Sequence, residues 1–282
     1  MSKVTANEIA GKTIEIETLP EVTVRIIEVV QDPRSTAHDL HRIVSNDPAL
    51  SARVLRVVNS AFYGLPGQIG SIDRAIMLLG LNAVKNIAIA ASLTKMFKDS
   101  TPCDDFSGKD LWTHCVAVGA ANKLITCAIG LALPDEAFLA GLIHDLGLVA
   151  LIQCYSNRIP EIVNHVKAGI PFRQAEEKII ETNHQEIGMA LTAKWKFPRS
   201  FHYVAGYHHN PLDLAKENRL LAAVTHISDI LCAGKSLGLS LTVEKQEVPA
   251  ELMEEIGLTE EKLNEVNERI EEELSVVKAL IE

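Results

Sequence analysis

Aromatic residues are few in this chain, at 5% of 282 positions, while Ala, Leu, Ile and Val are plentiful. Strands are rich in aromatic side chains, whereas Ala and Leu are strong helix formers, so this composition favours packed helices over a β-sheet protein. Strand-like alternation of useful length is missing outside residues 13–17. We therefore expect an all-α fold.

Cysteine is also scarce, with five residues, an odd number, and no CxxC pair. This pattern excludes a disulfide framework and is typical of reduced thiols in a cytoplasmic protein. The opening residues, MSKVTANEIAGK, lack the apolar segment of a secretory signal. The most apolar run, residues 137–152, is short for a bilayer span, and His144 and Asp145 interrupt it. We expect no membrane partner and interpret this run as a buried helix pair.

Positive charge is in the minority, with 27 Lys and Arg against 37 Asp and Glu, for a net charge of −10. A negative field disfavours non-specific contact with DNA, RNA or anionic lipid. The basic residues of the first half are dispersed and form no stripe. Bulk nucleic-acid binding is therefore not expected.

Helix-starting signals are dense along the chain. Asp47-Pro48 and Ser71 are good helix N-caps, and Gly80 can close the helix that Ser71 begins. Residues 98–110 are polar and are interpreted as a linker between two helical halves. We predict an N-terminal helical sub-domain over 1–100, a second helical sub-domain over 101–240, and acidic C-terminal helices over 241–282. An apolar stripe from Leu263 to Val277 should dock the last helix onto the rest.

Histidines and aspartates occur in an order that carries chemistry. Imidazole and carboxylate groups hold Fe, Mn, Zn or Mg in hydrolytic sites. The members of this set lie far apart in sequence and must come from separate helices, which is how helical bundles build metal sites in their cores. The predicted ligands are His114, His144, Asp145, His184, His208, His209 and Asp229.

This set can be divided between two sub-sites. One ion would be held by His114, His144, Asp145 and Asp229. A second would be held by the three remaining histidines, with Asp145 as a bridge. Adjacent residues on a helix point about 100° apart, so one of His208 and His209 can instead be a supporting residue behind the ligands. We expect a divalent transition metal, Fe, Mn or Zn, in a one-ion or two-ion centre.

Several motifs resemble a known family. GLIHDLG at 141–147 and HHNP at 208–211 look like the HD superfamily of metal-dependent phosphohydrolases. The first half narrows the resemblance to the HDOD domain, the HD-related output domain of bacterial signalling proteins. The segments that carry this narrower resemblance are LPEVTVRIIEVVQDP (19–33), NDPALSARVLRVVNSAFYG (46–64) and SIDRAIMLLGLNAVKNIAI (71–89).

The resemblance implies a two-part helical fold, an N-terminal bundle followed by an HD-like bundle, and a role in bacterial signal transduction. It also shows departures. Leu148 stands where the related HD-GYP phosphodiesterases have the lysine of HDIGK, and Asn210-Pro211 follows the paired histidines without a GYP sequence. A lysine near a phosphate offsets negative charge. Its loss places hydrolysis of cyclic dinucleotides in doubt, but not metal binding.

Three functions remain open. The first is a signalling output or scaffold module with a metal centre and without strong catalysis, whose input comes from a separate protein partner. The second is a metal-dependent phosphohydrolase acting on a nucleotide or cyclic dinucleotide, with Glu186 or His226 moving protons. The third is a scaffold whose site holds no metal. Whether the chain is an enzyme stays undecided at this point.

Overall fold

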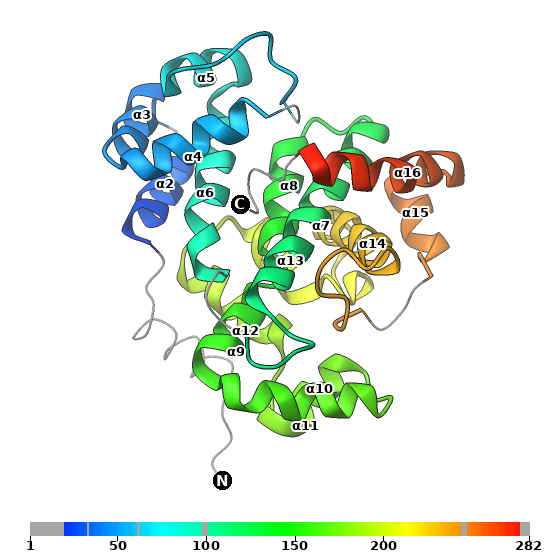
Figure 1. The fold of residues 1–282 in the computed structure, drawn as a ribbon. Helices are drawn as coiled ribbons and strands as arrows, with labels where there is room; N and C mark the ends of the chain where they lie inside the picture. Colours follow the sequence, from blue (N-terminus) through cyan, green and yellow to red (C-terminus); the bar gives the residue numbers. More distant parts are fainter. Residues whose placement is uncertain (1–19, 33, 61–62, 98–100, 244–246, 277–282) are drawn as a thin grey trace.

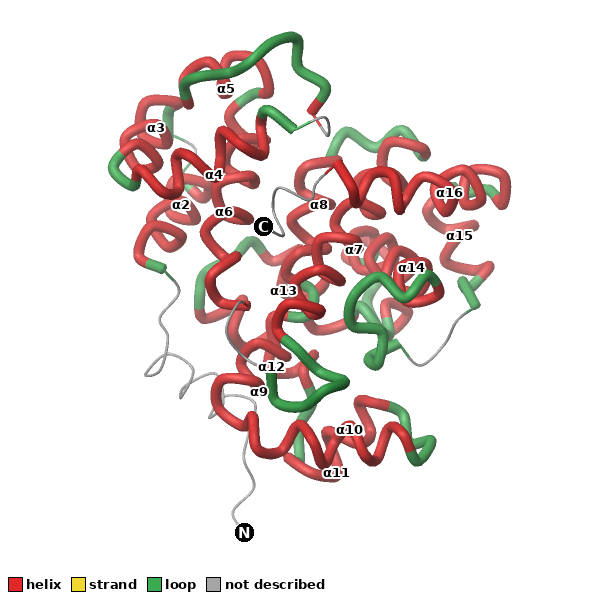
Figure 2. The backbone as a smooth tube through the Cα atoms, viewed as in Figure 1, coloured by secondary structure: helices red, strands yellow, loops and turns green. Residues whose placement is uncertain are grey.

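The structure is a computed structural model that describes residues 20–32, 34–60, 63–97, 101–243 and 247–276. Within these ranges it contains α-helices, short 3₁₀ turns and a single isolated bridge between Cys103 and Phe106, but no strand, as Figure 2 shows. The expected all-α class is confirmed. The strand-like residues 13–17 lie outside the described ranges.

Helices of the first half gather at one end of the molecule (Figure 1). A longer helix, α6, leads from this group into the rest of the chain and packs on helices of both halves. The members are α2 (Glu21–Gln31), α3 (Ala37–Ser45), α4 (Pro48–Val58), α5 (Ile72–Leu79) and α6 (Leu81–Phe97).

Side-chain caps start these helices where the sequence indicates. Thr36 and Asp39 form a reciprocal capping box at α3, so two otherwise unpaired N–H groups are satisfied. Asp47 accepts a hydrogen bond from the Leu50 N–H at α4, and Ser71 caps α5 in the same way. The predicted starts at Asp47 and Ser71 are thereby confirmed.

The second half forms the larger part of the molecule (Figure 1). Its main helices are α7 (Gly108–Ala128), α8 (Pro134–Ile143), α9 (Leu146–Tyr155), α10 (Ile159–Lys167), α11 (Phe172–Ile180), α12 (His184–Lys194), α13 (Arg199–Tyr207) and α14 (Leu220–Gly234). The remaining elements are the 3₁₀ turns η2 (Ser156–Arg158), η3 (Pro211–Asp213) and η4 (Lys216–Asn218), and the helices α15 (Ala250–Ile256) and α16 (Glu260–Val276).

One hydrophobic cluster extends through both halves, from Ile26 in α2 to Leu239 beyond α14. The segment expected to be a linker contributes to it, because Phe106 is fully buried and stacks on Phe172 with ring centroids 6.2 Å apart. The sub-domain limits at residues 100 and 240 stay a prediction. The continuous core indicates that the two halves are packed together rather than loosely tethered.

The apolar run at residues 137–152 forms the buried pair α8 and α9, as expected. By length and composition the stretch Pro134–Lys167 could cross a membrane, but 89% of its most apolar window is buried inside the protein. Core helices pass the same test, so this stretch is weak evidence for a membrane span. All five cysteines are free, and only Cys115 and Cys232 are fully buried.

A second hydrophobic cluster joins α7 and α14 to the C-terminal helices α15 and α16. Leu263, Val266 and Ile270 of α16 are buried in it, and Leu274 is partly buried against it. The expected docking stripe is thus confirmed up to Leu274. Val277 lies outside the described residues.

Candidate metal centre

The structure brings all seven predicted ligands together in the interior of the second half. They come from α7, the α8–α9 junction, the start of α12, the end of α13, and α14. Six are at most 1% exposed, and the His209 side chain is 11% exposed. The histidine/aspartate cluster, as we name it, consists of His114, His144, Asp145, His184, His208, His209 and Asp229.

The cluster divides into two groups. Within each group, the candidate ligand atoms all lie within 4.8 Å of one another. The first group is Asp145 with three histidines, and the second is His114, His144 and Asp229. One Asp145 oxygen lies 3.2 Å from His144 Nε2, and the other lies 3.4 Å from His208 Nε2. Asp145 therefore faces both groups, which is the position expected for a bridging carboxylate. That the residues bind metal stays a prediction.

Four of the histidines are fixed from behind through Nδ1. His144 Nδ1 lies 2.6 Å from the Gly141 carbonyl and His208 Nδ1 lies 3.1 Å from the Val204 carbonyl. His114 Nδ1 lies 3.3 Å from the Leu237 carbonyl. An acceptor on Nδ1 favours the tautomer whose Nε2 lone pair can act as a ligand. The Nε2 atoms of His144 and His208 have no hydrogen-bond partner, whereas His114 Nε2 lies 2.9 Å from Asp229 Oδ1.

The fourth anchored histidine uses a carboxylate. His184 Nδ1 lies 2.6 Å from Glu176 Oε2, and its backbone N–H donates to the same oxygen. Glu176 is fully buried in the middle of α11, the helix that precedes α12. His184 Nε2 then lies 3.0 Å from His209 Nε2. Two nitrogen lone pairs at this distance repel each other unless a proton or a cation lies between them.

Several inward atoms of the cluster lack any hydrogen-bond partner. Buried polar atoms without partners are uncommon in proteins because the loss of hydration is not offset. Here all of them belong to the atom types that bind transition metals, and they converge on one region. The atoms are His144 Nε2, His208 Nε2, Asp145 Oδ1, Asp145 Oδ2 and Asp229 Oδ2. This donor set fits one or two divalent ions.

Protonation of His144 supplies positive charge beside the carboxylates of the cluster. Burial disfavours charged His144, but the adjacent Asp145 carboxylate outweighs that effect and raises the pKa of His144 to about 9. Burial opposes ionisation of Asp145 too, yet the surrounding imidazoles hold its pKa well below the usual value. Burial and the neighbouring histidines lower the pKa of His209 strongly, so it is neutral.

Glycine allows the supporting helices to approach closely. A Cβ on Gly147 of α9 would overlap the carbonyl of His184, and a Cβ on Gly141 would overlap the backbone of Gly119 in α7. Gly147 does not itself break the helix. The break lies instead at His144 and Asp145, and Gly147 is needed where α9 touches α12.

The structure places the two residues predicted to move protons, His226 and Glu186, differently. His226 supports the cluster, because its Nδ1 lies 2.7 Å from the His208 carbonyl. Glu186 is exposed and accepts a hydrogen bond from Thr182, so it is not placed to move protons at the cluster. Glu176 was not singled out from the sequence. The Nδ1 acceptors were missed as well, since backbone carbonyls leave no sequence signal.

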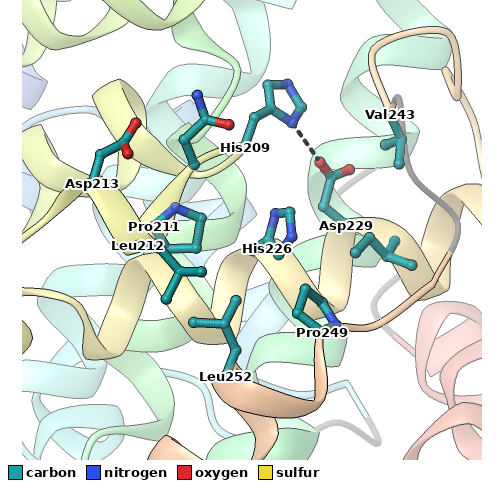
Figure 3. Close-up of a pocket in the computed structure, with 11 residues that line it drawn as sticks. His209, Pro211, Leu212, Asp213, His226, Asp229, Val243, Pro249 and Leu252 are labelled. Atoms are coloured by element: carbon teal, nitrogen blue, oxygen red, sulfur yellow. Dashed lines mark ion pairs between the residues drawn. The ribbon is translucent and has the colours of Figure 1, made fainter.

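A cavity of about 360 Å³ opens beside the cluster. His209 and Asp229 form one wall, with their ring nitrogen and carboxylate oxygen 3.6 Å apart (Figure 3). Pro211, Leu212 and Leu252 form an apolar floor. No lysine or arginine is among the described residues that line it.

The HDOD domain family matches residues 16–211, well over half of the chain, and the chain belongs to this family. An uncharacterised protein of Treponema pallidum (strain Nichols) is 26% identical over 207 residues, which cover 73% of this chain and 40% of the relative. The chain therefore spans about two fifths of that relative's length.

Solved structures share the fold. An HDOD domain protein of unknown function from Geobacter sulfurreducens has a TM-score of 0.81 at 24% identity, covering 98% of both chains. A protein named as a candidate phosphohydrolase from Shewanella amazonensis SB2B has a TM-score of 0.73 at 22% identity, covering 96% of this chain and 98% of the other. These identities are too low to transfer more than the fold.

Proposed function

We propose that this HDOD chain is a signalling output or scaffold module whose second half is held together by a centre for Fe, Mn or Zn, with capacity for two ions. The observation that carries the proposal is that buried imidazole and carboxylate atoms without hydrogen-bond partners converge, while the imidazoles are anchored from behind. Nitrogen and carboxylate donors without thiolate suit these ions. Two bound ions that share Asp145 would together cross-link five segments and stabilise the fold directly.

Elemental analysis of anaerobically prepared protein tests this proposal. We expect one to two equivalents of a transition metal, and a fall in melting temperature on chelation that Asp145→Ala abolishes. If the reducing preparation holds no metal and chelator leaves the melting temperature unchanged, the scaffold without metal is the correct reading. In that case Asp145→Ala should behave as an ordinary polar core substitution.

A metal-dependent phosphohydrolase is the second candidate, favoured by the cavity beside His209 and Asp229. A metal in such a centre lowers the pKa of bound water and polarises a phosphoryl oxygen. Against this candidate, Leu148 is fully buried and the described cavity lining carries no cationic side chain for a phosphate. Turnover of a nucleotide and cyclic-dinucleotide panel with Mn or Fe decides it, with Asp145→Ala as the control for contaminants.

The signalling role is supported by the family match and by a structural neighbour. A Marinobacter aquaeolei VT8 protein named as a candidate signal transduction protein has a TM-score of 0.77 at 21% identity, covering all of this chain and 62% of the other. We infer a bacterial, cytoplasmic protein that acts through a separate protein partner. Loss of a signalling output on deleting the gene, restored by the wild-type chain but not by Asp145→Ala, would support this role.

A further inference from the structure

Two helices that end at the histidine/aspartate cluster begin at a second cavity. Helix α8 leads to His144 and helix α13 leads to His208. Pro134 at the start of α8 and Pro198 at the start of α13 both line a cavity of about 370 Å³, which we name the seam cavity. Helix α6 of the first half completes it. The ten residues of α8 span roughly 15 Å, so the seam cavity and the cluster lie at opposite ends of the same helices.

Lys85 of α6 lines the seam cavity and is only 7% exposed. It forms no hydrogen bond or ion pair with the residues that the structure describes. Burial of its ammonium group lowers the pKa of Lys85. The ammonium group is poorly hydrated rather than fully enclosed, and an anion in the cavity would supply the hydrogen-bonded partner that it lacks among the described residues. The charge therefore indicates a negatively charged ligand.

The helix starts add a second attraction for anions. Neither α8 nor α13 has a side-chain cap, since Leu133 and Pro198 occupy the two N-cap positions. Their first N–H groups are left without side-chain acceptors, and the helix dipoles place partial positive charge there. Such ends bind anions. Asp135 and Glu136 in the first turn of α8 partly offset the positive end of that helix, so Lys85 and the start of α13 supply most of the attraction.

Two carboxylates, Asp135 and Glu136, also line the seam cavity and limit the charge of the ligand. Glu136 accepts a hydrogen bond from Ser200, and Asp135 lies 3.5 Å from the Tyr63 hydroxyl. Lys123 also attracts Asp135, against the effect of burial, which raises the pKa of Asp135. Both acids have protein partners, yet their negative charge would repel a phosphate dianion more than a monoanion.

The side-chain amides of Asn82 and Asn86 also line the seam cavity. Each amide offers donors and an acceptor, so the lining suits a ligand with hydroxyl or amino groups. We propose that the seam cavity binds a small organic monocarboxylate of the hydroxy-acid or amino-acid type, its carboxylate held by Lys85 and by the N–H groups that begin α8 and α13.

A ligand in this place would join α6 to the first turns of α8 and α13. Because these two helices carry ligands of the candidate metal centre at their other ends, occupancy would alter metal affinity. This coupling rests on the proposed metal centre, whereas binding of the carboxylate does not. The seam cavity is thus an input site for the second half.

Saturation-transfer NMR on the methyl group of L-lactate tests binding in the wild-type protein, before and after chelation. We also measure melting temperature with L-lactate, acetate, L-glutamate and inorganic phosphate at constant ionic strength. At a hundredfold excess over Kd, we expect L-lactate to raise the melting temperature by about 5 to 10 °C. Phosphate should have a smaller effect.

Lys85→Met should abolish this shift and raise the melting temperature of the protein without ligand, because the unpartnered charge is gone. Lys85→Arg should retain the shift in part, and Lys194→Met, at an exposed lysine of α12, should retain it fully. The inference is overturned if no carboxylate binds the wild-type protein, if Lys85→Met keeps the shift, or if phosphate binds more tightly. Binding that persists in chelated protein, with no effect on metal affinity, removes only the coupling.

Discussion

The two halves of the molecule bury polar groups in different ways. In the described part of residues 20–97, no fully enclosed side-chain nitrogen or oxygen lacks a partner. Thr23 donates to Ser92, for example, and Ser92 donates to the Ile89 carbonyl. In the histidine/aspartate cluster, by contrast, five inward atoms have none. Among the described residues, enclosed polar atoms without partners are thus confined to the second half, and those of the cluster leave a gap that a cation fits.

Removal of metal should produce the largest effect. At a free metal concentration of a thousand times Kd, binding contributes about 4 kcal/mol to the stability of the folded state. Chelation should then lower the melting temperature by roughly 8 to 16 °C. Differential scanning calorimetry with and without chelator measures this. An unchanged melting temperature in protein shown to contain metal would contradict a structural role for the cluster.

Gly147→Ala should have the next largest effect, because the new Cβ would overlap the His184 carbonyl. Separating α9 from α12 should cost about 1–3 kcal/mol and weaken metal binding. Gly234→Ala is the matched control, since its Cβ meets nothing within 4 Å, and it should stabilise by no more than about 1 kcal/mol. Equal urea midpoints for the two variants would refute the close-approach role.

The helix caps and the composition of the site could be predicted from the sequence, whereas the close helix contacts could not. The caps at Asp47 and Ser71 are local and were readable, because donor and acceptor lie three residues apart. The convergence of the seven site residues was predicted from residue type, pairing and family resemblance. The close contact at Gly147 was not predictable, since helix spacing is set by tertiary packing that no periodicity reports.

Glu176 shows why the supporting residues were missed. It lies in FRQAEEKII, where consecutive charges look like a solvated helix face. Glu177 beside it has a side chain that is 50% exposed and accepts a hydrogen bond from Asn183, while Glu176 is fully buried on His184. Only the turn between α11 and α12 decides which of the two faces inward. That turn brings residues eight positions apart into contact.

The pH dependence should have opposite signs with and without metal. The pKa of His144 is about 9 in the folded protein against 6.5 ordinarily, so its protonation stabilises the metal-free protein below about pH 6.5. This contribution is lost as the pH rises through 9. Metal must displace the same proton, so affinity should rise up to about tenfold per pH unit until pH 9. Chelator competition and melting curves between pH 6 and 9 measure both trends, and parallel trends would contradict the assignment.

Glu176→Gln should weaken metal binding about 10- to 100-fold, because a neutral amide oxygen accepts from His184 Nδ1 more weakly than the carboxylate and makes the imidazole a poorer ligand. The protein should still fold, since the side chain keeps its size. Glu177→Gln, one residue further on, should leave affinity unchanged. Chelator competition at fixed pH compares them, and equal affinities would show that Glu176 has a packing role alone.

Thr23→Val should have the smallest effect on stability. It tests directly whether the first half is stabilised independently of metal at the cluster. Valine keeps the shape of threonine but removes the 2.6 Å hydrogen bond to Ser92, which should cost about 1 kcal/mol. Because Thr23 shares no contact with the histidine/aspartate cluster, this loss should be the same in metal-loaded and chelated protein. A larger loss in one state would show that metal at the cluster also governs the first half, and that the two halves do not stabilise themselves independently.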